Sequence, residues 1–410
     1  MDPARPAPAG ATASWITVLT LFSLTSIIET IGVSQIIAFL PLDLKTIGLP
    51  QSEIPRWVGL LNAATFIFGL PLVPLWGVFA DKYSRKLVIV RSAVVETLVF
   101  GLVALSRRPW ELAASLLLVG FQLGNTGVML AAIRDVTPRA RIGTAIAIFG
   151  AASPIGFAAG PALGGFLLDH LRTSIAAVYA LSSALSAASA VMLTVGLREI
   201  RPAVAPRAPM LVLAYGAMRG VFTDASTRRL FTLFGLSLVA RMMSGPFLPI
   251  AVGRLIGSGI GLASAIALVV GTAALVGGIV SPAAGALGDC LGFRPVLVAS
   301  LLGAGLALTA VPFAPNVYSL AAVSAASAVF NAGVGAMVFA LLAVQIPPER
   351  RSATLNLVYL PLYLAGIVGP AVGALVVAAG LPMVFYAAAV VVWMGAMLEL
   401  VRPLTPAPAP

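Results

Sequence analysis

The sequence predicts an all-α membrane protein of twelve transmembrane helices, and three observations carry that prediction. The 410 residues are 60% hydrophobic and only 10% charged, whereas a globular chain has about 25% charged residues. The mean hydropathy is +1.04. The apolar residues lie in long runs, and about 20 of them make a helix that crosses hydrocarbon, where the backbone has no other hydrogen-bond partners.

Twelve such runs follow one another along the chain. Six precede a polar stretch, at residues 15–41, 56–80, 87–105, 111–133, 142–168 and 173–196. Six follow it, at residues 229–250, 260–284, 295–313, 318–345, 353–379 and 382–401. Runs longer than about 20 residues indicate helices that tilt or extend beyond the lipid.

The polar stretch divides the chain into two parts. Residues 197–228 contain several prolines and arginines and are expected to form a linker. It would join a first six-helix bundle, 15–196, to a second, 229–401. The ends, 1–14 and 402–410, are expected to be disordered tails.

The basic residues orient the helices. With the N-terminus in the cytoplasm, 18 of the 25 Lys and Arg lie on the cytoplasmic side and six lie outside. The cytoplasmic set is Arg5, Lys82, Arg85, Lys86, Arg91, Arg134, Arg139, Arg141, Arg198, Arg201, Arg207, Arg219, Arg228, Arg229, Arg294, Arg350, Arg351 and Arg402. The external set is Lys45, Arg56, Arg107, Arg108, Arg172 and Arg254. Because Lys and Arg concentrate in cytoplasmic loops, we expect a multi-pass cell-membrane protein with both termini cytoplasmic. The same distribution explains the net charge of +11 without a nucleic-acid partner.

The two halves repeat each other. Three features return 208 or 209 residues later: Gly77-x-x-x-Asp81 as Gly285-x-x-x-Asp289, Gly160-Pro161-x-x-Gly164 as Gly369-Pro370-x-x-Gly373, and Arg141 as Arg350. Nearly equal offsets at three places predict two pseudo-symmetric six-helix bundles.

The loop between spans two and three, GVFADKYSRK, carries the most specific motif. It places Gly77, Asp81, Lys82, Arg85 and Lys86 in register with Gly-x-x-x-Asp-(Arg/Lys)-x-Gly-(Arg/Lys)-(Arg/Lys), with Ser84 at the second Gly. The second copy, GALGDCLGFR, keeps Gly285, Asp289, Gly292 and Arg294, with Cys290 where a base is common. This loop is the signature of the major facilitator superfamily, which the chain resembles over nearly its whole length. The resemblance implies two six-helix bundles around a central cavity lined by spans one, four, seven and ten.

A second motif resembles the drug:proton antiporter branch of that superfamily. Span five contains Gly156, Gly160, Pro161, Gly164 and Gly165 in the pattern Gly-x-x-x-Gly-Pro-x-x-Gly-Gly. Small residues four apart let two helix backbones approach closely, and proline removes a backbone donor and favours a kink. Ordinary small-residue packing is the alternative. The family's upstream Gly is Ala147 here, and its span-four Arg-x-x-Gln-Gly is GFQLG, with Gly120 at the Arg position.

Two charged residues lie near the middle of predicted spans, Glu29 in span one and Arg241 in span seven. A charge there costs at least about 2.5 kcal/mol, so it lines water or is paired. A carboxyl removed from water resists ionisation, so our hypothesis is that Glu29 is a proton switch whose protonation releases a bound cation or relaxes a pair with Arg241. The alternative is a static Glu29–Arg241 pair that holds two helices together. Glu29 suits a cationic substrate, Arg241 suits an anion, and a neutral or zwitterionic compound fits both.

Polar and soft side chains near the expected cavity are candidate substrate contacts. They are Gln122, Asn125, Met129, Met242 and Asn331. Gln122 and Asn125 share a helix face, and Met suits varied apolar ligands. Bonding between helices is the alternative for the amides, and packing is the alternative for Met.

Three other ionisable residues have structural interpretations. Glu96 in span three is expected to pair with Arg91 or with bases of the nearby loop. Asp169 and His170 end span five on the outer side and could titrate, although a lone His at the end of a loop is usually a solvated residue.

The repeated loop is expected to be a conformational latch. In the resembled family it bridges to helices of the other half and stabilises the outward-facing state. Topology alone needs neither the acid Asp81 nor its repeat Asp289. A carboxylate is stabilised at a helix N-terminus, so we expect Asp81 to meet the start of span eleven near Ser352.

The resemblance implies a monomeric secondary transporter that exports a small lipophilic molecule in exchange for protons. A facilitator or importer is the nearest alternative, and a non-transporting sensor or scaffold is an alternative from another class. The chain has one cysteine, Cys290, one histidine, His170, and no metal-spaced cluster, Ser/His/Asp set or P-loop. We therefore expect no metal, no cofactor, no disulfide, no ATP-driven pumping and no enzymatic activity.

Overall fold

The computed structural model describes residues 14–200, 208–223, 225–257, 260–345 and 359–401. Within these residues it contains 12 helical segments long and apolar enough to cross a membrane. They are Trp15–Thr46, Ile54–Lys82, Arg85–Leu105, Pro109–Val136, Arg139–His170, Ile175–Gly196, Thr227–Leu255, Leu262–Leu291, Phe293–Phe313, Val317–Leu342, Leu360–Ala379 and Leu381–Val401. The predicted fold class is confirmed.

The first half of the chain forms spans one to six. Its elements are α1 (Trp15–Thr46), α2 (Ile54–Ile67), α3 (Gly69–Lys82), α4 (Arg85–Leu105), α5 (Pro109–Leu117), α6 (Val119–Gln122), α7 (Asn125–Val136), η1 (Arg139–Arg141), α8 (Ile142–Gly165), η2 (Phe166–His170) and α9 (Ile175–Gly196). Spans two and four are each built from more than one helix. Within this half α1 packs on α8 and α9, and α4 packs on α9.

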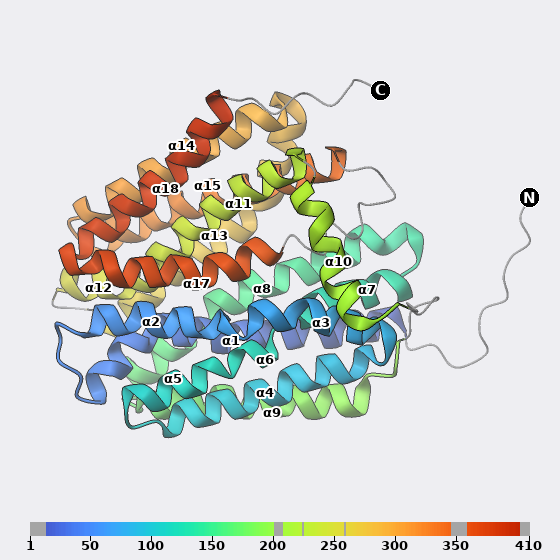
Figure 1. Cartoon of the computed structure of the whole chain (residues 1–410). Coiled ribbons are helices and arrows are strands. Elements are labelled where there is room, and N and C mark those ends of the chain that lie inside the picture. Colours follow the sequence, from blue (N-terminus) through green and yellow to red (C-terminus); the bar gives the residue numbers. More distant parts are fainter. Residues whose placement is uncertain (1–13, 201–207, 224, 258–259, 346–358, 402–410) are drawn as a thin grey trace, which may run out of the picture.

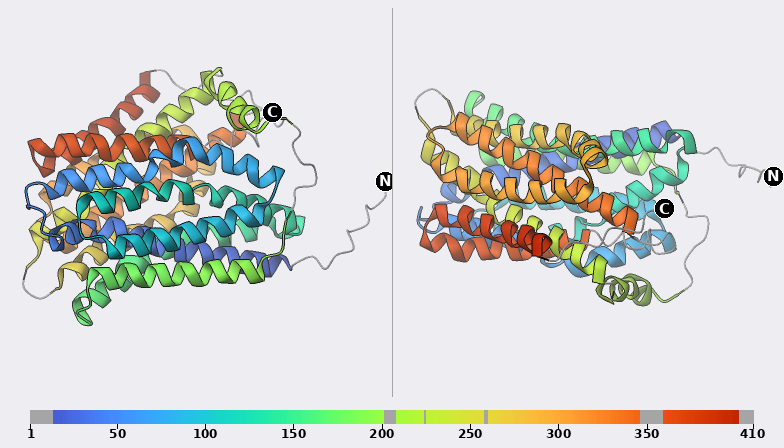
Figure 2. Two further views of the ribbon diagram at one scale, coloured as in Figure 1. Left: turned by 60° about the horizontal axis from the view of Figure 1, so that its bottom comes forward. Right: turned by 90° about the horizontal axis from the view of Figure 1, so that it is seen from above.

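The second half forms spans seven to twelve. Its elements are α11 (Ala225–Ser244), η3 (Gly245–Phe247), α12 (Leu248–Leu255), α13 (Leu262–Leu291), α14 (Phe293–Ala310), η4 (Val311–Phe313), α15 (Val317–Gln345), α17 (Tyr359–Val376), η5 (Val377–Ala379) and α18 (Leu381–Val401). α11 packs on α15, α17 and α18, and α14 packs on α15 and α18. Figures 1 and 2 show the long helices of both halves running alongside one another.

The predicted linker contains a helix that the sequence interpretation did not include. α10 (Met210–Thr223) packs against α3, and the Tyr215 hydroxyl donates a 2.8 Å hydrogen bond to the Pro71 carbonyl. In Figure 1 α10 crosses the molecule near the ends of α3 and α7. We call this the linker end and the opposite one the far end. Arg350, Ser352 and the tails 1–13 and 402–410, for which sequence analysis makes predictions, lie outside the described residues.

The two halves are joined at the far end by two helix pairs, α8 with α13 and α2 with α17. Added β-carbons show how close these pairs come. A methyl group at Gly165 would lie 3.0 Å from the Ala263 carbonyl oxygen, and one at Gly278 would lie 2.6 Å from Pro154 Cβ. Nearer the linker end, a methyl group on Gly150 of α8 or Gly285 of α13 would meet nothing within 4 Å. The α8–α13 contact therefore closes at the far end and opens toward the linker end.

Candidate coupling and substrate site

Glu29 of α1 is held by two amide side chains from span four. Its Oε1 accepts a 3.2 Å hydrogen bond from Gln122 Nε2, and its Oε2 accepts a 2.9 Å bond from Asn125 Nδ2. Glu29 is half-buried, and both amides are buried. Gln122 and Asn125, predicted as substrate contacts, therefore bind the predicted proton switch in this structure.

A break in span four positions the two amides. Sequence analysis treated residues 111–133 as one continuous helix, but α6 ends at Gln122 and α7 begins at Asn125. Gly124 between them has φ of +96°, a left-handed conformation that suits glycine. The break leaves backbone carbonyls without helical partners, and such groups must be satisfied inside a membrane.

Side chains of α4 satisfy those carbonyls. Arg91 Nη2 donates to the carbonyls of Gln122 and Leu123 at 3.2 and 3.1 Å, and Ser92 Oγ donates to Gln122 at 2.7 Å. The Arg91 guanidinium also lies 3.7 Å from the ring centroid of Trp76, a cation–π contact. Arg91 thereby stabilises the broken segment that presents the amides to Glu29.

Two ionisable residues of α4, the half-buried Arg91 and the buried Glu96, were not predicted as site residues. Arg91 binds the carbonyls at Gln122 and Leu123, next to the amide that holds Glu29. Glu96 is 2% exposed, and its Oε1 has no hydrogen-bond partner in the described part of the chain. Glu96 was expected to pair with Arg91 or with loop bases, and no such ion pair occurs among the described residues. Both residues are ionisable groups inside an apolar run, and that signal could have identified them.

Arg241 is placed apart from this cluster. Its side chain is exposed, and the structure shows no ion pair or side-chain hydrogen bond between Arg241 and any described residue. Glu29 has Gln122 and Asn125 as its partners instead. The expected Glu29–Arg241 pair is therefore not formed in this structure, because the span-four amides and Arg91 occupy the surroundings of Glu29.

The other predicted substrate contacts lie in different environments. Met129 is fully buried in the apolar core of the first half, between helices that leave it no exposed surface. Met242 is half-buried and lies against Gly369 of α17. Asn331 Nδ2 donates a 2.8 Å bond to the Ser327 carbonyl of its own helix. In this conformation only Met242 and Asn331 have surface available to a ligand.

The loop after α3 bonds to residues of the first half and to Glu199 at the start of the linker. Arg85 is 4% exposed and pairs with Asp81 at 2.9 Å and with Asp135 at 2.7 Å. The Glu199 carboxylate accepts hydrogen bonds from the backbone N–H of Arg85, at 3.0 Å, and from the Ser84 hydroxyl. Asp81 thus has a partner on the next helix, while the expected position near Ser352 lies outside the described residues.

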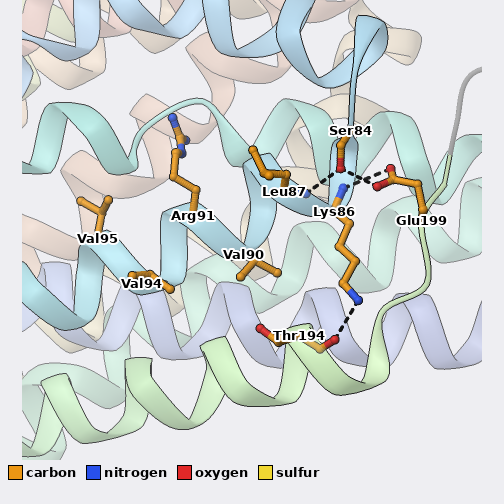
Figure 3. Close-up of a pocket in the computed structure, with 9 residues that line it drawn as sticks. All are labelled: Ser84, Lys86, Leu87, Val90, Arg91, Val94, Val95, Thr194 and Glu199. Atoms are coloured by element: carbon orange, nitrogen blue, oxygen red, sulfur yellow. Dashed lines mark hydrogen bonds between the residues drawn. The ribbon is translucent and has the colours of Figure 1, made fainter.

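A pocket of about 460 Å³ lies beside this loop, between α4 and α9. Figure 3 shows Ser84, Lys86 and Glu199 at one end of it and valines along α4. Lys86 Nζ donates to the Thr194 carbonyl at 2.7 Å, whereas the Arg91 side chain points away from Lys86. Because α4 and α9 lie on the side of the first half remote from α11–α18 in Figure 1, this pocket is separate from the interface between the halves.

The repeated loop of the second half makes a different arrangement. Glu399 of α18 is fully buried and pairs with Arg229 at 3.1 Å and with Arg294 at 3.0 Å. In the register of the repeated motif Arg294 is equivalent to Lys86, whereas Phe293 stands at the position of Arg85, so the two halves anchor different motif positions on acids. Gly285 and Asp289 precede this cluster at the end of α13.

The span-five glycines pack against two neighbours. A methyl group at Gly156 would overlap Thr30 and Ile27 of α1, one at Gly160 would overlap Ser34 and Ile31, and one at Gly164 would overlap Phe39. Gly165 instead faces α13 across the interface between the halves. The motif thus forms the close α1–α8 contact, with Pro161 buried inside α8.

Asp169 joins the two halves directly. Its Oδ2 accepts a 2.6 Å hydrogen bond from the backbone N–H of Ser264 in the first turn of α13. The residue before that turn, Gly261, has no side chain to cap the helix, and a methyl group there would overlap the Asp169 carboxylate. Asp169 therefore caps a helix of the other half, a role that sequence analysis did not predict.

Comparison with known proteins identifies the family. The sequence profile described as "Major Facilitator Superfamily" matches the chain twice, over residues 22–239 and 230–410. The chain belongs to the Major Facilitator Superfamily. One relative is "Multidrug resistance protein MdtG" of Klebsiella pneumoniae (strain 342), 30% identical over 314 residues, which cover 73% of this chain and 72% of the relative. The protein of the same name from Proteus mirabilis (strain HI4320) is 27% identical over 384 residues, with 92% and 93% covered.

Solved structures of this superfamily share the fold. A bacterial homologue of the human lysosomal transporter Spinster, in an inward-facing and occupied conformation, has a TM-score of 0.77 at 16% identity and covers 96% of this chain and 97% of its own. The nucleoside transporter NupG has a TM-score of 0.76 at 16% identity, with 94% and 99% covered. This Major Facilitator Superfamily member is accordingly a multi-pass membrane transporter of small molecules.

Proposed function

We propose that this transporter exports small lipophilic molecules from the cytoplasm in exchange for protons, by alternating access, as a monomer in the cell membrane. The observation that carries the proposal is the Glu29 carboxylate, held inside the first span by Gln122 and Asn125. Neutral amides stabilise the charged form and still permit protonation, because no ion pair has to break. The names of the multidrug-resistance relatives support export as the direction.

The charge distribution supports the orientation that export needs. The linker end carries most of the Lys and Arg, so it is the cytoplasmic end under the positive-inside rule. The conformation described above, closed at the far end and open toward the linker end, is then inward-facing and able to admit a cytoplasmic substrate. In the exchange that we propose, external protons reach Glu29 in the alternative, outward-facing conformation.

The two matches to the family profile support the proposed division of the chain. We place the first bundle at 15–196, the linker at 197–228 and the second bundle at 229–401. The linker includes α10, which lies against α3. A linker that packs on the first bundle still allows the two bundles to move relative to each other.

Flux in everted membrane vesicles tests this function. Three fluorescent probes cover the possible charges: N-phenyl-1-naphthylamine, ethidium and anilinonaphthalene-sulfonate. We expect vesicles with an acidic lumen to accumulate at least one probe, a protonophore to abolish the accumulation, and Glu29→Gln to remove its dependence on the gradient. Glu53→Gln is the matched control, because Glu53 is an exposed acid at the far end.

The outcomes separate the alternatives. Probe entry that stops when the concentrations inside and outside are equal, and that the protonophore does not change, would identify a facilitator. Movement of probes only in the opposite direction would identify an importer. Vesicles that move none of the three probes would contradict the proposal and favour a sensor or scaffold.

A further inference from the structure

Arg241 occupies the centre of the seventh span. That span runs from Thr227 to Leu255, so Arg241 is fourteen residues from each end. A charge at this depth costs about 2.5–3.5 kcal/mol when it has no partner. Such a cost is normally offset by an ion pair or by contact with water or a ligand.

The described part of the chain provides no counter-charge for Arg241. Its guanidinium makes no ion pair there, and its side chain is exposed. The buried acid of the second half, Glu399, is already paired with Arg229 and Arg294. Glu29, the acid at similar depth, is held by amides. Among the described residues, Arg241 is therefore a cation without a counter-charge in the middle of span seven.

The packing of α11 shows which of its faces is not covered by neighbouring helices. α15, α17 and α18 pack against this helix, and the continuation of the span through η3 contacts α1 and α2 of the first half. The exposed side of α11 is thus the side not covered by its own bundle. Arg241 lies there, one turn before η3, at the interface between the halves.

An aromatic surface lies on the same face, toward the linker end. Phe234 precedes Arg241 by seven residues, which is two turns of the helix and about 10 Å along its axis. The Phe234 ring packs edge-on against Phe339 of α15, with centroids 6.0 Å apart. Phe339 is 42% exposed. An apolar platform therefore lies about 10 Å from the cation, on the side that opens toward the linker end.

We infer that Arg241, with the Phe234–Phe339 pair, forms a binding site for an amphiphilic organic anion: a carboxylate, sulfonate or phosphonate joined to an apolar or aryl body about 10 Å long. The guanidinium offers paired N–H donors that match a carboxylate, and the aromatic pair contacts the body. This inference deepens the proposed function by naming the substrate class. It leaves Glu29 free for the proton.

Binding to the purified transporter in detergent tests the site. The probe is 4-biphenylcarboxylate, and its neutral isostere 4-biphenylcarboxamide has the same shape. We expect the anion to bind at least about tenfold more tightly, since charge-assisted hydrogen bonds contribute about 1.5–3 kcal/mol. Benzoate has the charge without the length and is expected to bind more weakly than 4-biphenylcarboxylate.

Three variants test which residues produce the preference for the anion over the amide. Arg241→Gln should bind the anion and the amide equally. Phe339→Ala should weaken both ligands by the same factor and keep the preference for the anion. The matched control is Arg254→Gln, which removes an exposed arginine near the far end of the same span and should change nothing.

The result that overturns the inference is specific. An anion preference that survives in Arg241→Gln, equal binding of anion and amide to the native protein, or no binding of either ligand would each refute the site. The test needs no pH gradient, so it is separate from the proposed antiport. Selective anion binding without gradient-driven flux would contradict the proposed antiport and support the anion site. Gradient-driven flux without a preference for the anion would support the antiport and refute the site.

Discussion

Asp169 at the end of span five accepts a 2.6 Å hydrogen bond from the backbone N–H of Ser264, at the start of span eight. This bond links the two halves at their far end, where α8 and α13 are in close contact. A carboxylate at a helix N-terminus is stabilised by the free N–H groups and by the helix dipole. The bond can form only while that end is closed.

We predict that Asp169→Asn weakens closure of the far end. The amide lacks the charge that favours a helix N-terminus, a contribution of about 0.3–1 kcal/mol. In a Cys290→Ser background, Ala263→Cys should react faster with an impermeant maleimide when Asp169→Asn is added. Ala263 is 1% exposed in the closed form, so labelling reports opening.

Gly261→Ala should act in the same direction as Asp169→Asn, because its methyl group would overlap the Asp169 carboxylate. Glu53→Gln, also at the far end, is the control and should leave labelling unchanged. Equal labelling rates in all four proteins would show that the Asp169–Ser264 bond does not contribute to closure.

Gly124→Ala should disturb the break in span four. A β-carbon in the left-handed conformation costs about 1–2 kcal/mol, and this one would also lie 3.4 Å from Trp76 Cβ. We expect a lower melting temperature in detergent and impaired proton coupling, since Gln122 and Asn125 flank the break. Gly127→Ala is the control, because a methyl group there meets nothing within 4 Å. A fully stable and coupled Gly124→Ala protein would mean that the break is not needed.

Asp81→Asn should leave membrane insertion intact and slow transport. Arg85 keeps its second partner, Asp135, at 2.7 Å, so the loop stays folded. If the loop is a latch, loss of the Asp81 charge slows the step in which the two halves exchange contacts at the linker end. Membrane abundance and initial transport rates should be measured together. Full turnover at normal abundance would leave the loop with a role in topology alone.

Glu399→Gln should destabilise the second half. The carboxylate is fully buried between Arg229 and Arg294, and removing one member of a buried ion pair costs about 3–5 kcal/mol. The melting temperature of the purified protein measures the effect, with Glu53→Gln as an exposed control. A change no larger than that of the control would show that water reaches the cluster.

The twelve spans were predictable because each is an apolar run long enough to cross a membrane, and that property is local. The partners of Glu29 were not predictable in the same way. They depend on the break at Gly124, whose carbonyls are satisfied by Arg91 from another span. Residue spacing within span four suggested a continuous helix and a substrate role for Gln122 and Asn125.

Asp169 and Arg241 illustrate two further limits of sequence. The contact of Asp169 with Ser264 joins residues 95 positions apart across the two halves, and no local pattern encodes it. Arg241 was recognisable as a charge in the middle of a span. That no described acid pairs with it depends on where those acids point, which local sequence does not encode.

The central claim is that Glu29 exchanges a proton for substrate, and substrate-driven proton movement measures this directly. Vesicles with a trapped pH-sensitive dye and no imposed gradient receive the same three probes. We predict that adding a transported probe moves protons in the opposite direction in the native protein and moves none in Glu29→Gln, while Glu53→Gln behaves as native. Proton movement of native size in Glu29→Gln would contradict the account.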